Sequence, residues 1–366
     1  MSSGAETPRQ PRPGQPKKGR GAVSNTGSRY LPTRSERVDD GWGLDPEDGA
    51  ARITTVALPD RTKTLLTKNT SPDIPFDHSI NPYKGCEHGC VYCFARPTHA
   101  FLDLSPGLDF ETRLFYKTDV REHLHKELCR RGYVPTPIAL GTNTDPYQPL
   151  ERTQRVTRTV LEVMLECNHP VTLVTKSELA LRDLDLWQAL ASRNLAKVAV
   201  SITTLDRDLK RKLEPRTASP AARLRTVAAF AEAGVPVSVM AAPMIPFIND
   251  AELEAILEAA ADAGARQAAY ILLRLPLEVA ELFEEWLEAH YPLKKERVLS
   301  AVRQSRGGKL YRSRWGERMR GTGAFAELLS ARFARAARRL GLDSDRDLSA
   351  LRPDLFVAPH PQQSLF

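Results

Sequence analysis

Short apolar runs alternate with longer segments of helical apolar spacing through the middle of the chain, from about residue 135 to residue 291. The runs with the length and composition of buried strands are PTPIALGTN, PVTLVTKS, AKVAVSITT, PVSVMAAPMIP and QAAYILLRL. Helical segments follow them, such as SPAARLRTVAAFAEAG, which begins on a Ser-Pro pair and ends on Gly. With a further strand expected just before residue 81, the pattern predicts about six βα units.

Repeated βα units predict a parallel sheet with crossover helices, in an α/β fold. The strand runs are apolar throughout, so both faces of the sheet need covering. This suits an open doubly wound sheet as well as a complete or partial barrel. In all of these folds the chemistry gathers at the C-terminal ends of the strands. Polar groups stand at that position here, in GTNTDPYQP, TKS, SITT and APMIPFIND.

Composition divides the chain into five segments. Residues 1–45 are rich in Pro, Gly, Ser and Arg and lack an apolar period, which predicts disorder. The other predicted segments are a lead-in at 46–77 that includes the strand-like RITTVAL, a core at 78–292, a basic C-terminal extension at 293–342 and a tail at 343–366.

The net charge of +7 is unevenly distributed. Residues 1–38 contain eight Lys or Arg against two Glu, and residues 303–339 contain eleven against two. Two basic ends suggest a polyanionic partner, most simply nucleic acid, although solvated charged faces are an equal alternative. Within YRSRWGERMRG, Tyr311 and Trp315 alternate with arginines, as in surfaces that stack bases and hold phosphates. The alternative is a basic loop across the barrel mouth with Trp315 in the core.

The sequence MSSGAETPRQPRPGQPKKGRG lacks the apolar region of a secretory signal, and no apolar stretch is long enough to span a bilayer. We therefore expect a cytoplasmic protein without a membrane partner. Five cysteines in a reducing compartment argue for metal or redox chemistry rather than disulfides. Cys129 and Cys167 lie singly in helical patterns, where a cysteine is most often a small core residue.

The other three cysteines, Cys86, Cys90 and Cys93, lie within eight positions in NPYKGCEHGCVYCFARP. With His88 they could form a structural zinc site of the Cys3His type, although such modules usually pair two ligand hairpins. A [4Fe–4S] cluster is the other candidate, because its usual ligands are thiolates and three of them leave one iron open.

The C-x3-C-x2-C spacing, with an aromatic residue before the last cysteine, resembles the radical S-adenosylmethionine (SAM) superfamily. The longer stretch NPYKGCEHGCVYCFAR is similar to the spore photoproduct lyase branch, whose members are often labelled DNA repair photolyases, and the likeness extends over about residues 78–275. The resemblance implies a partial (β/α)6 barrel with a [4Fe–4S] cluster on Cys86, Cys90 and Cys93. It further implies cleavage of SAM to methionine and a 5′-deoxyadenosyl radical, which abstracts hydrogen in a lyase-like or modification reaction. A flavodoxin- or ferredoxin-type protein would supply the electron.

The resemblance also implies a set of SAM contacts. Tyr92 should pack near the adenine or the cluster, Lys176 should meet the SAM carboxylate, and Ser201 should contact the ribose or carboxylate. The remaining implied contacts are a polar stretch near SAM, Thr142, Asn143, Thr144 and Asp145, and the backbone around Met240, Ala241 and Ala242 beside the adenine. Within KLEPR, Glu214 and Arg216 could bind polar SAM atoms or form a helix-end ion pair. His88 could be a ligand of the cluster or a hydrogen-bond donor to its sulfurs, and we favour the second role because such hydrogen bonds tune the potential of the cluster.

One departure concerns Thr142, which stands where spore photoproduct lyase carries a cysteine that returns hydrogen to the product radical. A hydroxyl is a much poorer hydrogen-atom donor than a thiol, so repair by that route is in doubt. The alternatives are a radical SAM enzyme with a small-molecule or protein substrate, and a metal-stabilised nucleic-acid-binding module without turnover. The final QQSLF resembles a sliding-clamp binding peptide, with Gln362, Leu365 and Phe366 as its contacts.

Overall fold

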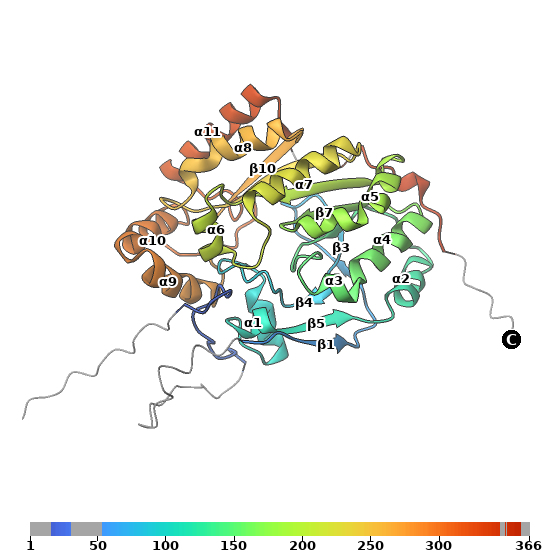
Figure 1. Ribbon diagram of the computed structural model, residues 1–366, viewed down its shortest axis with the longest axis horizontal. Helices are drawn as coiled ribbons and strands as arrows, with labels where there is room; N and C mark the ends of the chain where they lie inside the picture. The colour runs from blue at the N-terminus through green and yellow to red at the C-terminus, as the bar shows by residue number, and fades with distance from the viewer. Residues whose placement is uncertain (1–15, 31–52, 345–347, 349, 360–366) are drawn as a thin grey trace, which may run out of the picture.

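A computed structural model describes residues 16–30, 53–344, 348 and 350–359 of the chain (Figure 1). Its main element is an eight-stranded sheet in the order β11-β10-β9-β8-β7-β6-β3-β2, in which only β2 is antiparallel to its neighbour. The strands are β2 Leu66–Lys68, β3 His78–Ile80, β6 Ile138–Leu140, β7 Val171–Thr175, β8 Ala196–Ser201, β9 Val237–Met244, β10 Gln267–Leu272 and β11 Asp343–Ser344.

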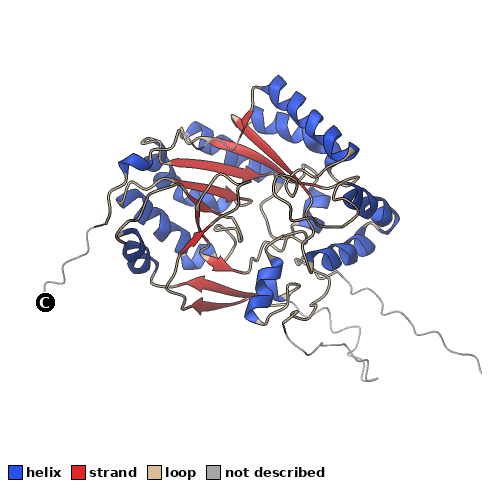
Figure 2. Cartoon of the chain, turned by 180° about the vertical axis from the view of Figure 1, so that it is seen from behind, coloured by secondary structure: helices blue, strands red, loops and turns tan. Residues whose placement is uncertain are grey.

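Helices connect the parallel strands and lie on the outer side of the curved sheet (Figure 2). Strands β3, β6, β7, β8, β9 and β10 correspond to the six expected βα units, so the predicted α/β fold and its partial barrel are confirmed. The α-helices are α1 Asp109–Thr112, α2 Val120–Leu128, α3 Glu151–Gln154, α4 Val156–Glu166, α5 Leu184–Ala191, α6 Arg207–Leu213, α7 Pro220–Glu232, α8 Leu253–Asp262, α9 Val279–His290, α10 Lys295–Gln304 and α11 Ala324–Leu340. The 3-10 helices are η1 Arg96–Leu102, η2 Glu178–Asp183, η3 Asp250–Glu252, η4 Pro292–Lys294 and η5 Pro353–Leu355.

Local sequence signals account for these elements where they are strong. Ser219 caps α7 by accepting a hydrogen bond from the Ala222 amide, and Pro220 occupies the first helical position. The helix then buries Val227 and Phe230 against the sheet. All six residues of β8 are buried, as expected for a parallel strand that is covered on both faces.

A second, three-stranded sheet lies beside the barrel and appears below it in Figure 1. It consists of β1 Val56–Asp60, β5 Arg113–Lys117 and β4 Tyr83–Lys84, with β5 in the centre. The strand expected in the lead-in segment is therefore present as β1. Because β4 ends two residues before Cys86, this small sheet fixes the start of the cysteine loop.

Residues 16–30 pack against the core, whereas we expected them to belong to a disordered tail. Ala22 lies in a buried apolar cluster with Leu108 and Leu282 of α9. The buried Arg20 donates from Nη1 to the carbonyl oxygen of Glu111 at 2.9 Å. Hydrogen bonds hold much of this segment, which explains why the apolar pattern did not reveal it.

The C-terminal extension also packs on the barrel. Helix α11 lies on α8, where Arg332 and Arg339 form ion pairs with Glu254 and Glu258 (Figure 1). Beyond it, the Val357 amide donates to the carbonyl of Cys167 at 2.8 Å.

Two further observations concern partners. The clamp-like residues Gln362, Leu365 and Phe366 lie outside the described residues. Within the described part of the chain, every helix is too short or too polar to cross a bilayer.

Candidate active site

The cysteine loop follows β3 and β4, at the C-terminal end of the first parallel strand of the barrel. The hydrogen bonds that hold its backbone include those from Cys86 N to Phe110 O (2.8 Å), from Gly89 N to Cys86 O (3.3 Å) and from Cys93 N to Cys90 O (3.2 Å). All three cysteines carry free thiols, with Cys86 and Cys90 buried and Cys93 partly exposed. Cys93 is therefore the accessible member of the triad.

Burial raises the pKa of Cys86 well above its ordinary value and that of Cys90 to about 12, because a buried thiolate lacks solvation. A bound cationic centre would stabilise the thiolates at these positions. Within the described residues, no group of three His, Cys, Asp or Glu side chains is arranged to hold one metal ion. A polynuclear cluster with an open iron fits this donor set, since it needs only these three thiolates from the chain.

His88 points to Asp145, with its Nδ1 3.3 Å from the Asp145 carboxylate. The same carboxylate accepts hydrogen bonds from the Thr175 hydroxyl at 2.8 Å and the Lys176 amide at 2.7 Å. Burial alone would raise the pKa of Asp145, but the charge and hydrogen bond of His88 lower it to about 2. Asp145 thus joins the cysteine loop to the segments that follow β6 and β7.

Tyr92 extends into a buried polar layer beneath the triad. Its hydroxyl and that of Thr203 both donate to the Glu214 carboxylate, which also pairs with Arg223. Burial would raise the pKa of Glu214, but Arg223 and Lys176 lower it to about 2. The Lys176 ammonium lies 6.0 Å from the centroid of the Tyr92 ring.

Glu214 and Arg216 do not pair with each other, although an ion pair between them was one expectation. Arg216 pairs instead with Glu87 at 3.1 Å. Glu214 is fully buried, and its carboxylate is already occupied by three side chains.

The remaining expected contacts lie around the C-terminal ends of the strands. The Thr142 hydroxyl and the Asn143 amide both donate to Asn81, at 3.3 and 3.0 Å, while Thr144 donates to the Tyr83 carbonyl at 2.9 Å. Ser201 donates to the Ala242 carbonyl at 3.3 Å. These hydroxyls donate to other protein groups, which holds the loops together. Their contacts with SAM stay predictions.

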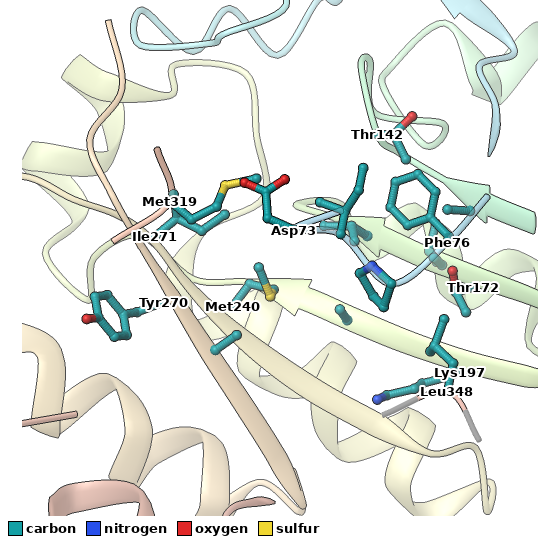
Figure 3. Close-up of a pocket in the computed structure, with 17 residues that line it drawn as sticks. Asp73, Phe76, Thr142, Thr172, Lys197, Met240, Tyr270, Ile271, Met319 and Leu348 are labelled. Atoms are coloured by element: carbon teal, nitrogen blue, oxygen red, sulfur yellow. The ribbon is translucent and has the colours of Figure 1, made fainter. Parts of the chain in front are cut away.

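A cavity of about 170 Å³ is lined by Thr142 and Met240 (Figure 3), whereas Asn143 and Thr144 line a separate pocket. Met240 and Thr142 project into the cavity, whereas the side chain of Ala241 belongs to the core on the other face. Successive side chains of a β-strand point to opposite faces of the sheet, so Met240 and Ala241 face different sides. Asp73 and Met319 come from distant parts of the chain to line the same cavity.

Several residues at the site escaped the sequence analysis. Glu111 is fully buried and accepts hydrogen bonds from Gly21 N at 3.0 Å, Ala22 N at 2.8 Å and Arg96 Nη2 at 2.5 Å. Arg96 also donates to the Cys90 carbonyl at 2.9 Å. The arginine and the glutamate are visible in the sequence, in CFARP and in FET. Neither stretch has the spacing of a known motif, so the sequence did not indicate that the two residues pair.

Comparison with known proteins places this site in a family. Residues 80–260 match the model of the radical SAM superfamily. These residues are a radical SAM domain. An uncharacterized protein of Mycobacterium tuberculosis is 38% identical over 221 residues, and one of Methanocaldococcus jannaschii is 26% identical over 213 residues. The match covers 60% of this chain and 65% of the mycobacterial protein, and 58% and 76% respectively in the archaeal case.

The fold is also similar to that of solved structures. Spore photoproduct lyase complexed with dinucleoside spore photoproduct aligns with a TM-score of 0.59 at 18% identity, over 80% of this chain and 81% of the other. At that identity the likeness establishes the radical SAM fold, without extending the lyase's substrate to this protein.

Proposed function

We propose that the protein is a radical SAM enzyme that acts on nucleic acid. The observation that carries the proposal is the C-x3-C-x2-C triad, placed after the first parallel strand of a partial barrel with only Cys93 accessible. Cys86, Cys90 and Cys93 would hold a [4Fe–4S] cluster. When bound, the cluster supplies one electron that cleaves SAM and yields a 5′-deoxyadenosyl radical for hydrogen abstraction.

The chain's own residues would bind and orient SAM. Lys176, at the end of β7, offers a cation for the SAM carboxylate. Asp145 holds the Lys176 amide and His88, and thereby fixes the cysteine loop relative to β7. Ser201, Met240 and the backbone of Ala241 and Ala242 would border the nucleoside, beside Tyr92 and the polar residues Thr142, Asn143 and Thr144.

A thiol for returning hydrogen is not placed near this site. Cys129 donates to the Pro359 carbonyl at 2.6 Å, and Cys167 belongs to the buried core. Thr142, which the sequence resemblance aligns with the hydrogen-returning cysteine, lines the cavity. We therefore favour a reaction that does not end with hydrogen donation from a protein thiol.

Basic and aromatic residues on the C-terminal extension support nucleic acid as the substrate. Trp315 is 52% exposed, so the alternative that placed it in the core is wrong. Many arginines of the extension are already engaged: Arg312 and Arg314 pair with Glu317, and Arg318 pairs with Asp73. All three arginines lie on the loop between α10 and α11, so a phosphate bound there would compete with these ion pairs for the guanidinium groups. A flavodoxin- or ferredoxin-type reductant belongs to the same proposal.

The test is anaerobic reconstitution with iron and sulfide, reduction with dithionite, addition of SAM and assay of 5′-deoxyadenosine. We expect the wild-type protein to form 5′-deoxyadenosine, Cys90→Ala to lose both cluster and product, and Cys167→Ala to retain the cluster as a matched control. Bound zinc without SAM cleavage would favour the binding-module alternative. SAM cleavage without nucleic-acid binding at any salt concentration would favour a small-molecule or protein substrate.

A further inference from the structure

The accessible side of the cysteine triad is bordered by an aromatic ring and a guanidinium group. Phe94 follows Cys93 directly and is 43% exposed, although it belongs to a loop in which its neighbours are mostly buried. The guanidinium carbon of Arg274 lies 4.4 Å from the centroid of the Phe94 ring. Arg274 lies just after β10, the last of the six barrel strands, whereas Phe94 lies in the loop that follows the first. The fold has thus assembled this pair from positions 180 residues apart.

Arg274 differs from its neighbouring arginines in lacking an oxygen partner. The Arg318 guanidinium pairs with both oxygens of Asp73, at 2.6 and 2.8 Å. Arg306 donates to four backbone carbonyls, among them Leu272 at 3.0 Å and Leu273 at 2.9 Å. Within the described residues, Arg274 has one hydrogen bond, from Nη1 to the Met319 sulfur at 3.3 Å, and no ion pair.

Most N–H donors of the Arg274 guanidinium can therefore still bind an anion. A thioether sulfur is a weak acceptor, and a guanidinium carries five N–H donors in a planar fork. Burial lowers the pKa of Arg274, since partial desolvation disfavours its charge. An oxyanion bound here would restore that lost stabilisation and would be held more strongly than in open solvent.

A second pair of the same kind lies nearby. The guanidinium carbon of Arg318 is 4.4 Å from the centroid of the exposed Trp315 ring. Arg274 contacts Met319, the next residue after Arg318, and Met319 and Asp73 both line the cavity (Figure 3). Two exposed rings, each with a guanidinium against it, are therefore connected to one cavity, Arg274 through Met319 and Arg318 through Asp73. Alternating aromatic and cationic groups match the alternation of base and phosphate along a single strand.

We propose that Arg274 and Phe94 form a nucleotide subsite, in which Arg274 binds a phosphodiester of a single-stranded substrate and the exposed surface of Phe94 stacks on the adjoining base. This inference rests on the proposed function and names the side of the site where substrate enters. Phe94 lies next to Cys93, so a base stacked there is held beside the reacting centre. The SAM carboxylate is another source of an anion, but Lys176 already provides a cation for it.

The experiment measures binding of a fluorescently labelled, single-stranded DNA of mixed sequence to the reconstituted protein by anisotropy, with an RNA strand in parallel. Arg274→Gln and Phe94→Leu should each weaken binding about tenfold, as expected for loss of a charge-assisted contact or one stacked base. Arg274→Gln should also reduce the slope of log K against log salt by about 0.7, the loss of one phosphate contact on a single strand. Arg274→Lys should keep that slope while binding more weakly, because lysine lacks the planar fork that packs on Phe94.

Arg297→Gln is the matched control. Arg297 also lies over a phenylalanine ring, 4.0 Å from the centroid of Phe247, but on the exposed surface of α10. We expect the Arg297→Gln variant to bind the oligonucleotide with the affinity of the wild type. A far-UV spectrum and thermal scan of each variant separate lost binding from lost folding.

Three results would overturn the subsite. These are wild-type affinity in both Arg274→Gln and Phe94→Leu, no oligonucleotide binding by the wild type, and an Arg274→Gln variant that loses affinity for SAM while keeping it for the strand. The last result would assign the anion to the SAM carboxylate. SAM cleavage by the wild-type protein, assayed without any strand, tests the proposed function separately: if it succeeds while the subsite fails, only this inference falls.

Discussion

Lys176 provides the sharpest prediction for a single residue of the proposed SAM site. Its ammonium faces the Tyr92 ring and interacts electrostatically with Glu214 and Cys90. Lys176→Met should weaken SAM binding about 10- to 100-fold, since a charge-assisted hydrogen bond contributes about 1.5–3 kcal/mol. Iron content should remain at the wild-type level because the cysteine ligands are untouched. Equilibrium binding of SAM to reconstituted protein measures the change, and Lys176→Arg should recover part of the affinity.

A second prediction for one residue concerns Asp145, which connects three loops at the site. Asp145→Asn keeps the size of the side chain but removes the charge that faces His88. It also weakens the acceptors for the Thr175 hydroxyl and the Lys176 amide. We expect a loss of about 3 kcal/mol in unfolding free energy, as for a buried pair deprived of one partner. Denaturant unfolding of Asp145→Asn and of Asp185→Asn, an exposed aspartate, provides the comparison; equal losses would contradict the role of Asp145.

Among the elements, the segment Gly19–Ala22 acts as a strap over the cysteine loop. A Cβ atom on Gly21 would lie 1.7 Å from the Gly89 carbonyl oxygen, and Gly89 belongs to the loop itself. Gly21→Ala must therefore displace either the strap or the loop, at a cost of about 1–3 kcal/mol for overpacking. Because Gly21 N and Ala22 N also donate to Glu111, the displacement would break buried hydrogen bonds. Faster loss of iron to a chelator is the expected result.

Gly19→Ala is a control from the same strap. Gly19 has a φ of +74°, but a Cβ atom there would meet nothing within 4 Å. This substitution adds only backbone strain of about 1–2 kcal/mol. If Gly19→Ala and Gly21→Ala released iron at the same rate, strain in the strap rather than its contact with Gly89 would explain both.

How much the sequence predicts also differs between elements. The six parallel strands and helices such as α7 could be predicted because apolar periods and a Ser-Pro cap are local signals. The cysteine loop was recognisable because its spacing is a motif. The strap could not be predicted, since Gly21 and Ala22 bind Glu111 through backbone amides that every non-proline residue has. The pairing of Arg274 with Phe94 could not be predicted either, because the two residues are 180 positions apart in the sequence.

For the whole molecule, two buried histidines predict how stability depends on pH. Burial lowers the pKa of His99 and of His169 to about 4, from an ordinary value of 6.5. The His99 ring lies 2.9 Å from the Arg113 carbonyl, and the His169 ring lies 2.7 Å from the Tyr133 hydroxyl and 3.0 Å from the Pro170 carbonyl. Neutral imidazoles satisfy these contacts, with an N–H donating to each carbonyl and His169 Nε2 accepting from Tyr133.

The direction in which stability changes with pH follows from the protons that the two histidines take up on unfolding. Between pH 6.5 and pH 4 the unfolded chain binds protons at these histidines and the folded chain does not, so stability falls as the pH falls. From pH 7 to pH 5 the loss should be about 2 kcal/mol for each histidine, at about 1.36 kcal/mol per pH unit below the unfolded value. Urea unfolding of the cluster-free protein at several pH values measures it. His169→Gln can keep both hydrogen bonds without titrating, and should remove about half of the loss. An unchanged pH dependence in that variant would show that His169 does not take up a proton on unfolding.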